Sequence, residues 1–329
     1  MIENILRKYG WLGDLRSAIK KISKLERLDN KDLKIQKEFL KRFYYGDRFS
    51  QIKIKDQFVA DVISAYQSYW CQMLLKKLIL NEGENYLYQK LCEVFDKHKI
   101  NYKNCRNLDQ LEKSLGHQFD KKGVYYILGS VLPYRELEIW KKQTSKIYNV
   151  KLPNKNRKVK VVFLHDFIIR GWADYATVGV SYPSGWAKKD ALFCIKDAYN
   201  QRSEKFKCSY LVHETQHFDD YKHFPKLEQI DLEYRAKLAE LIMSKKRTYE
   251  LLDKFIVTMN NNPSSPHAYA EYCLLRDLSF GLSNKKMVRR LIEWKKISAV
   301  AIRNACFNIL SLHTKNLNIK GARRVRGIL

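Results

Sequence analysis

The pentapeptide His213-Glu-Thr-Gln-His217 constrains the local structure of this chain more than any other feature of its sequence. Its two histidines are four residues apart, and positions i and i+4 of an α-helix lie on one face about one turn from each other. Two imidazole rings on that face can converge on a single metal ion. We therefore expect a helix over residues 213–217 and a metal site on it.

The residue types in this motif favour Zn²⁺. Neutral imidazole suits zinc, and a catalytic zinc site has three protein ligands and one position left for water. Glu214 follows the first histidine, so its carboxylate can lie beside that position and take a proton from the water. We predict His213 and His217 as metal ligands and Glu214 as general base. The alternative is a helix whose histidines are ordinary surface or core residues.

The spacing of apolar residues changes near residue 147. Before it, apolar residues recur mainly every three to four positions, as along Asp56–Leu80, which predicts a long helix. The same pattern covers, less strongly, residues 15–25, 33–45, 86–95 and 108–115. We expect a helical N-terminal region over residues 1–147 and a catalytic region over 148–329 with a helical C-terminal part.

Three segments rich in valine, isoleucine and aromatic residues follow, at residues 158–167, 175–182 and 191–196, and turn-forming residues separate them. They predict three strands of one small mixed sheet, at about residues 158–196, ahead of the helix that bears the motif. The predicted fold class is therefore α+β and mostly helical.

Helix-capping residues frame the motif. Ser203 can cap a helix that runs to about Tyr221, and Asp231 can cap a second helix that runs to about Lys246. Helical spacing returns at residues 269–278 and 286–311.

A catalytic zinc needs a third ligand, and two downstream residues could supply it. Glu233 lies on the expected second helix, and His223 lies six residues beyond His217. Carboxylate and imidazole are both zinc ligands. The ligand types alone leave both residues as candidates.

YLVHETQHFDDY followed by DLEYRAKLAEL resembles the zincin metallopeptidases, and within them the gluzincin branch. In that branch a glutamate on a second helix, often in an E-x-x-A setting, completes the zinc site; the matching positions are Glu233 and Ala236. The resemblance implies a metallopeptidase that uses Zn²⁺ to hydrolyse a peptide or protein substrate. It also implies a sheet whose edge strand lines the substrate cleft, at residues 175–182 or 191–196.

The spacing from His213 to His223 also resembles the metzincin branch, which uses a third histidine. That pattern has a glycine where this chain has Asp220, because the backbone turns sharply there and glycine adopts positive φ without strain. The E-x-x-A setting and the missing glycine make Glu233 the favoured third ligand. Lys237 stands where many gluzincins place an aspartate that orients a zinc-bound histidine, so another group must fill that role.

Hydrolysis of an amide also needs a donor that stabilises the oxyanion formed when water attacks. The segment after the second ligand helix offers His267, Tyr269 and Tyr272. We predict His267 or Tyr269 in this role, with packing as the alternative for both.

The formal net charge is +27, from 62 basic and 35 acidic residues. Such an excess attracts nucleic acid and acidic partners. The alternative function is therefore a basic protein that binds nucleic acid or an acidic partner, with a structural or degenerate histidine motif. Neither a signal-peptide core nor a membrane-spanning apolar stretch is visible, and the cysteines follow no disulfide framework, so we expect a cytoplasmic protein.

Overall fold

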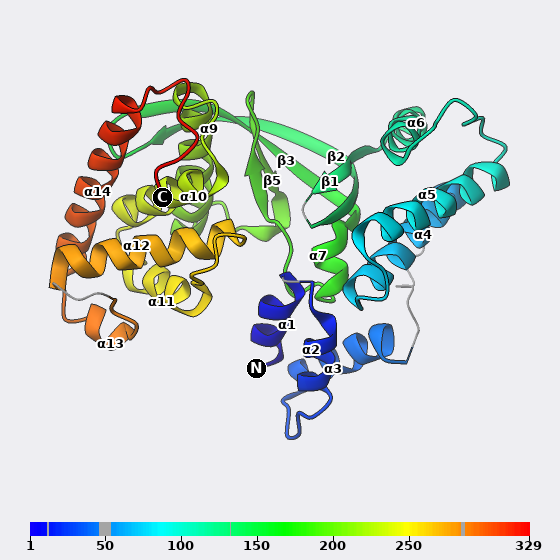
Figure 1. The fold of residues 1–329 in the computed structure, drawn as a ribbon, viewed down its shortest axis with the longest axis horizontal. Helices are drawn as coiled ribbons and strands as arrows, with labels where there is room; N and C mark the ends of the chain where they lie inside the picture. Colours follow the sequence, from blue (N-terminus) through cyan, green and yellow to red (C-terminus); the bar gives the residue numbers. More distant parts are fainter. Residues whose placement is uncertain (12, 46–53, 132, 284–286) are drawn as a thin grey trace. The chain divides into compact units, whose positions relative to one another are not determined.

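We describe the protein from a computed structural model (Figure 1), which covers residues 1–11, 13–45, 54–131, 133–283 and 287–329. The chain forms two compact units. Unit 1 comprises Met1–Lys142 and His165–Pro183, and unit 2 comprises Gln143–Leu164 and Ser184–Leu329. The sequence-based division at residue 147 therefore falls within unit 2.

Unit 1 is mainly helical, and all five helices expected before residue 147 are present. Most of these helices begin at an Asp or Asn side chain that accepts a hydrogen bond from a backbone N–H of the first turn, such as Asp56 at the start of α4. The helices are α1 (Ile2–Trp11), α2 (Leu15–Ile22), α3 (Asn30–Phe43), α4 (Gln57–Leu74), α5 (Leu80–Lys97), α6 (Leu108–Lys121) and α7 (Gly171–Ala176).

The expectation of helix up to residue 147 is wrong at its end. β1 (Tyr125–Val131) pairs antiparallel with the first residues of β2 (Tyr134–Lys151). Isoleucine, valine and aromatic side chains favour a pleated, half-buried surface, and here that preference prevails over the helical spacing.

The expectation of a strand at residues 175–182 is also wrong, because the end of α7 and a turn occupy this segment. Gly171 opens α7 with φ +84°, a left-handed conformation that glycine adopts without strain. Trp172 and Tyr175 of α7 are then buried in the core of unit 1, where Tyr175 packs against Trp70 of α4. Burial of these aromatic rings overrides the local strand preference.

The sheet has the strand order β1-β2-β3-β5-β4. β3 (Asn156–Arg170) and β5 (Leu192–Ile195) are parallel, and they match the strands expected at 158–167 and 191–196. β4 (Gly185–Ala187) pairs antiparallel with β5 and forms the sheet edge. Neither segment expected as the edge strand is one, since β5 is internal and 175–182 is not a strand.

Unit 2 carries the remaining helices. These are the 3₁₀-helix η1 (Lys196–Ala198), α8 (Glu204–Phe206), the π-helix η2 (Lys207–Val212), α9 (His213–His223), α10 (Gln229–Met243), α11 (Thr248–Thr258), α12 (Pro266–Ser283), α13 (Leu291–Trp294) and α14 (Ala299–Ile319). We expected a single helix over 286–311, but the structure has two, α13 and α14, with a break between them. Residue 286 itself lies outside the described residues.

The described residues of unit 2 form three hydrophobic clusters, and two of them are the cores that flank α10. One lies between the sheet and the η2–α9 helix, and it includes Val161, Leu192 and Tyr210. The other joins α10, α11, α12 and α14 through residues such as Leu238, Phe255 and Leu274. Helix α10 contacts α9, α12 and α14 (Figure 1), so it links the two cores.

In the part of the chain that the structure describes, no helix is both long and apolar enough to cross a membrane.

Candidate metal centre

One continuous helical segment presents the histidine motif. Ser203 caps it as expected, since its hydroxyl accepts a hydrogen bond from the backbone N–H of Phe206. Residues 207–212 then adopt π-helical hydrogen bonding before the regular helix α9 starts at His213. Such π segments inside helices occur frequently at functional sites, and no local residue pattern indicated this one.

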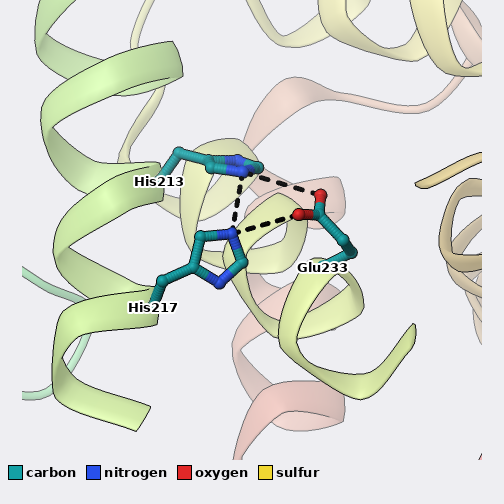
Figure 2. Close-up of side chains that lie close together, drawn as sticks. All are labelled: His213, His217 and Glu233. Carbon is teal, nitrogen blue, oxygen red and sulfur yellow. Dashed lines mark hydrogen bonds and ion pairs between the residues drawn. The ribbon is translucent and has the colours of Figure 1, made fainter. Parts of the chain in front are cut away.

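The structure brings three of the expected residues together. His213 and His217 project from successive turns of α9, and Glu233 approaches them from α10 (Figure 2). One ligand atom from each lies within 4.8 Å of the others. The two Nε2 atoms are 3.2 Å apart, His217 Nε2 is 3.2 Å from Glu233 Oε1, and His213 Nε2 is 3.6 Å from Glu233 Oε2.

These spacings fit a tetrahedral zinc site. Ligand atoms 2.0–2.1 Å from a tetrahedral zinc ion are about 3.4 Å from one another. The three separations, which involve both oxygens of Glu233, are close to that value. Glu233 is 2% exposed, and its Oε2 atom lies 2.8 Å from His267 Nδ1. A buried carboxylate is costly unless a cation or another group satisfies it, and two imidazoles with one carboxylate are a donor set that zinc accepts, so the residues present fit a bound cation.

The electrostatics of the three side chains differ. Burial lowers the pKa of His213, which favours the neutral ring that a metal requires. Burial opposes ionisation of Glu233, but the neighbouring His267 and His217 outweigh it and hold the pKa of this carboxyl well below its usual value. Burial also disfavours a charge on His217, yet the hydrogen bond with Glu233 raises its pKa. These shifts favour a carboxylate beside a protonated ring, whose proton a bound metal would displace.

Glu240 is a neighbour of the site that the sequence reasoning missed. Its Oε2 atom lies 3.5 Å from Nδ1 of His213, on the side of the ring away from the other two ligands. A carboxylate at this nitrogen fixes the tautomer and orientation of a metal-binding imidazole. Glu240 follows Glu233 by seven residues, or two helical turns, so the regular spacing along α10 was a signal that could have identified it.

Lys237 lies one turn after Glu233 and points into the same buried region. Its Nζ atom donates a hydrogen bond of 2.9 Å to Glu271 Oε1 of α12 and lies 3.8 Å from Glu233 Oε2. Thr258 donates to the other oxygen of Glu271, at 2.6 Å. Burial acts to lower the pKa of Lys237, but the charges of Glu271 and Glu233 outweigh it and raise the pKa. A buried ion pair between Lys237 and Glu271 therefore lies next to the third candidate ligand.

Glu214 lies between α9 and the sheet edge. Burial raises its pKa to about 8, although His217 acts in the opposite direction. The backbone N–H of Ala187 in β4 donates a hydrogen bond to its carboxylate. A carboxyl whose pKa lies near neutrality is suited to accept and return a proton. The charges of His217 and Glu233 act on Glu214, so its carboxyl lies near the three candidate ligands.

The two residues expected as oxyanion donors are placed differently. His267, in the first turn of α12, is 68% exposed, and its Nδ1 atom lies 2.8 Å from Glu233 Oε2. Tyr269 stacks on Tyr272 with a ring separation of 6.0 Å and packs against the α10–α12 core, and its hydroxyl lies beside Cys273. None of the contacts described for Tyr269 involves the three candidate ligands.

His223 lies away from the group. Its Nδ1 atom is 2.8 Å from the backbone oxygen of Asp219, and its side chain is 47% exposed. Asp220 does not mark a sharp turn, because α9 continues to His223. Instead Asp220 is fully buried and accepts a hydrogen bond of 2.9 Å from Arg235 of α10.

Asp231 is not the cap of α10, contrary to our expectation. The helix begins after Glu228, and Asp231 Oδ1 accepts hydrogen bonds from His313 of α14 and from the backbone N–H of Ile328. The start of α10 is thus fixed by α14 and the C-terminal segment. Such long-range partners have no local signature in the sequence.

Comparison of the chain with protein families, with curated proteins and with solved structures finds no match in any of the three.

Proposed function

We propose that this protein is a zinc-dependent hydrolase, specifically a metallopeptidase with a gluzincin-like ligand set. The observation that carries the proposal is the meeting of His213 and His217 from one helix with Glu233 from the next, at separations that suit a tetrahedral ion. Zinc held there would polarise a scissile carbonyl and lower the pKa of a water molecule. The other steps fall to side chains of the chain itself.

Glu214 is the residue that we assign to proton transfer. It follows the first ligand directly, and its raised pKa of about 8 suits a group that accepts a proton from water and later donates it to the leaving amine. His267 is the oxyanion donor that we prefer, because its exposed ring reaches the third ligand. We do not assign this role to Tyr269, whose hydroxyl lies beside Cys273 in the α10–α12 core.

The edge strand β4 supports a peptide as substrate. β4 pairs with β5 on one side only, and it contacts α9. An unpaired strand edge offers backbone N–H and C=O groups to an extended peptide, which can add as a further strand. Because Ala187 of this strand donates to Glu214, a peptide paired along β4 would pass beside the proposed base.

The test is cleavage of a peptide library by the zinc-loaded protein and by its Glu214→Gln variant. We expect the variant to retain one equivalent of zinc and to lose at least about 100-fold in turnover, because the proton acceptor is removed while the ligands stay. Glu250→Gln, at a surface ion pair on α11, is the matched control and should cleave normally. Full activity of Glu214→Gln would remove the proposed mechanism.

A further inference from the structure

The sheet of unit 2 has a second face, turned away from α9. Successive residues of a strand point to opposite faces, and directly paired residues share a face. Val161, Leu192 and Cys194 belong to the core beneath the sheet. Trp186 of β4 pairs with Phe193 of β5, which pairs with Val162 of β3. These residues alternate with the core residues, so they lie on the outer face.

Two aromatic rings on this face are parallel. Trp186 and Phe193 have ring centroids 5.7 Å apart and an angle of 5° between ring planes, and both side chains are partly exposed. The Nζ atom of Lys188 lies 5.1 Å from the Phe193 ring centroid. Parallel, partly exposed rings at a sheet edge form a platform on which other flat rings can stack.

Lysines continue the outer face along β3. Lys158 and Lys160 are exposed and precede Val162 by four and two residues, so they point to the same side as Val162. The segment Gln143–Leu164 contains six Lys and Arg residues and no Asp or Glu. Within this segment, therefore, no acidic side chain offsets the positive charge.

The basic side chains on the opposite side of the same hairpin, unlike Lys158 and Lys160, form ion pairs. Lys155 and Arg157 both form ion pairs with Asp219 of α9. Their charge is used to hold the hairpin against the helix. Lys158 and Lys160 point the other way, and no hydrogen bond or ion pair is described for them.

We propose that the outer face formed by Trp186, Phe193, Lys158, Lys160 and Lys188 binds single-stranded nucleic acid. Alternate lysines on a strand lie about 6.6 Å apart, a spacing that can follow successive phosphates of an extended strand. Parallel rings accept unpaired bases, whose faces a duplex conceals. An acidic peptide would use the lysines but leave the aromatic platform without a matching group. This activity is separate from the proposed hydrolase.

The test uses the full-length protein and fluorescein-labelled 12-nucleotide oligouridine and oligothymidine, with binding followed by anisotropy between 50 and 300 mM salt. Both oligonucleotides should bind, and the ratio of their affinities distinguishes an RNA from a DNA preference. A 12-base-pair duplex should bind at least about tenfold more weakly, because its bases are not available for stacking. Heparin serves as a polyanion without aromatic rings.

Two variants test the contribution of the lysine charges and the contribution of aromatic stacking separately. Lys158→Gln/Lys160→Gln should reduce the magnitude of the slope of log K against log salt by about 1.4, or 0.7 for each phosphate that is no longer neutralised. Lys34→Gln/Lys37→Gln, which removes the same charge from exposed positions of α3, should leave the slope unchanged. Trp186→Leu should weaken oligonucleotide binding about tenfold and leave heparin binding within twofold.

Equal effects of the two lysine pairs would overturn the proposal, because binding would then follow net charge alone. Equal losses of heparin and oligonucleotide binding in Trp186→Leu would also overturn it, and so would duplex binding as tight as single-strand binding. The lysine variants are surface substitutions, so they decide the question even if Trp186→Leu fails to fold. His213→Ala should bind oligonucleotide normally, which keeps this outcome independent of the hydrolase.

Discussion

Glu233 is the residue on which the choice of third ligand depends. It lies buried between His217, His213 and Lys237, whereas His223 is half exposed and bonded to the backbone of its own helix. Burial and convergence thus separate two candidates that the ligand types alone could not.

Replacement of these two residues should therefore have unequal effects on metal affinity. Glu233→Gln removes the only carboxylate of the described ligand group, and we expect zinc affinity to fall by at least about 100-fold. His223→Gln should change it by less than about twofold. Competition with a chromophoric chelator measures both constants, and a larger loss of affinity in His223→Gln would reverse the assignment.

At the residue scale, the sequence predicted the three candidate ligands but not the charged side chains that contact them. The i, i+4 spacing of the histidines and the setting of Glu233 indicated residues that the structure brings together. Glu240 and the Lys237–Glu271 pair were not found, because their roles depend on which neighbouring helix they face. The position of a lysine in the sequence does not indicate whether its side chain is exposed or forms a buried ion pair.

At the scale of elements, helix α10 organises the centre. One of its faces carries Glu233, Lys237 and Glu240, spaced by four and three residues, so α9 and α12 are both held to it by charged groups. The third ligand, the cation behind it and the group that orients His213 are therefore positioned together.

The ion pair between α10 and α12 gives a prediction about stability. Lys237→Met leaves Glu271 buried without its cation, and we expect the free energy of unfolding of the metal-free protein to fall by about 3–5 kcal/mol. Adding Glu271→Gln should recover at least half of that loss, because the uncompensated charge is removed. Urea unfolding measures each free energy; a double variant no more stable than Lys237→Met would contradict this account.

The sequence predicted most of the helices correctly but misplaced or missed some of the strands. Helices with a 3.6-residue pattern and an Asp or Ser cap, such as α4 and the helix opened by Ser203, were correctly placed. The short edge strand β4 was missed because its residues Gly185–Ala187 follow a proline and look like a turn. Residues 175–182 have strand preference, but burial of α7 in the unit 1 core decides their conformation.

For the whole molecule, the clearest pH effect on stability arises in unit 1. Glu136 of β2 is buried, and its Oε1 atom accepts hydrogen bonds of 3.0 Å from the backbone N–H groups of Leu137 and Trp172. It also lies against Gly171, where a β-carbon would collide with it. Burial raises the pKa of Glu136 to about 7, from an ordinary 4.5.

The folded protein therefore binds a proton between pH 4.5 and 7 that the unfolded chain has released, so this group lowers stability as pH rises. The decrease across this window is about 3 kcal/mol, and it is complete above the folded pKa. Glu136→Gln retains the accepting oxygen and removes the titration. The free energy of unfolding of the variant relative to the unmodified protein should rise by about 3 kcal/mol from pH 4.5 to 7; a constant difference would show that Glu136 titrates normally.

The overall α+β class could be read from the sequence, but the division of the chain could not. Residues 165–183 return to unit 1 after the hairpin segment Gln143–Leu164 has entered unit 2. Hydrophobic spacing reports local elements, whereas such a return depends on which core buries Trp172 and Tyr175.

Zinc K-edge X-ray absorption on protein loaded with one equivalent of Zn²⁺ tests the central claim most directly. We predict that only nitrogen and oxygen atoms coordinate the metal, at about 2.0–2.2 Å, with the signature of two imidazoles that disappears in His213→Ala and His217→Ala. A sulfur ligand at about 2.3 Å, or a spectrum that the two histidine substitutions leave unchanged, would contradict a metal centre built from His213, His217 and Glu233.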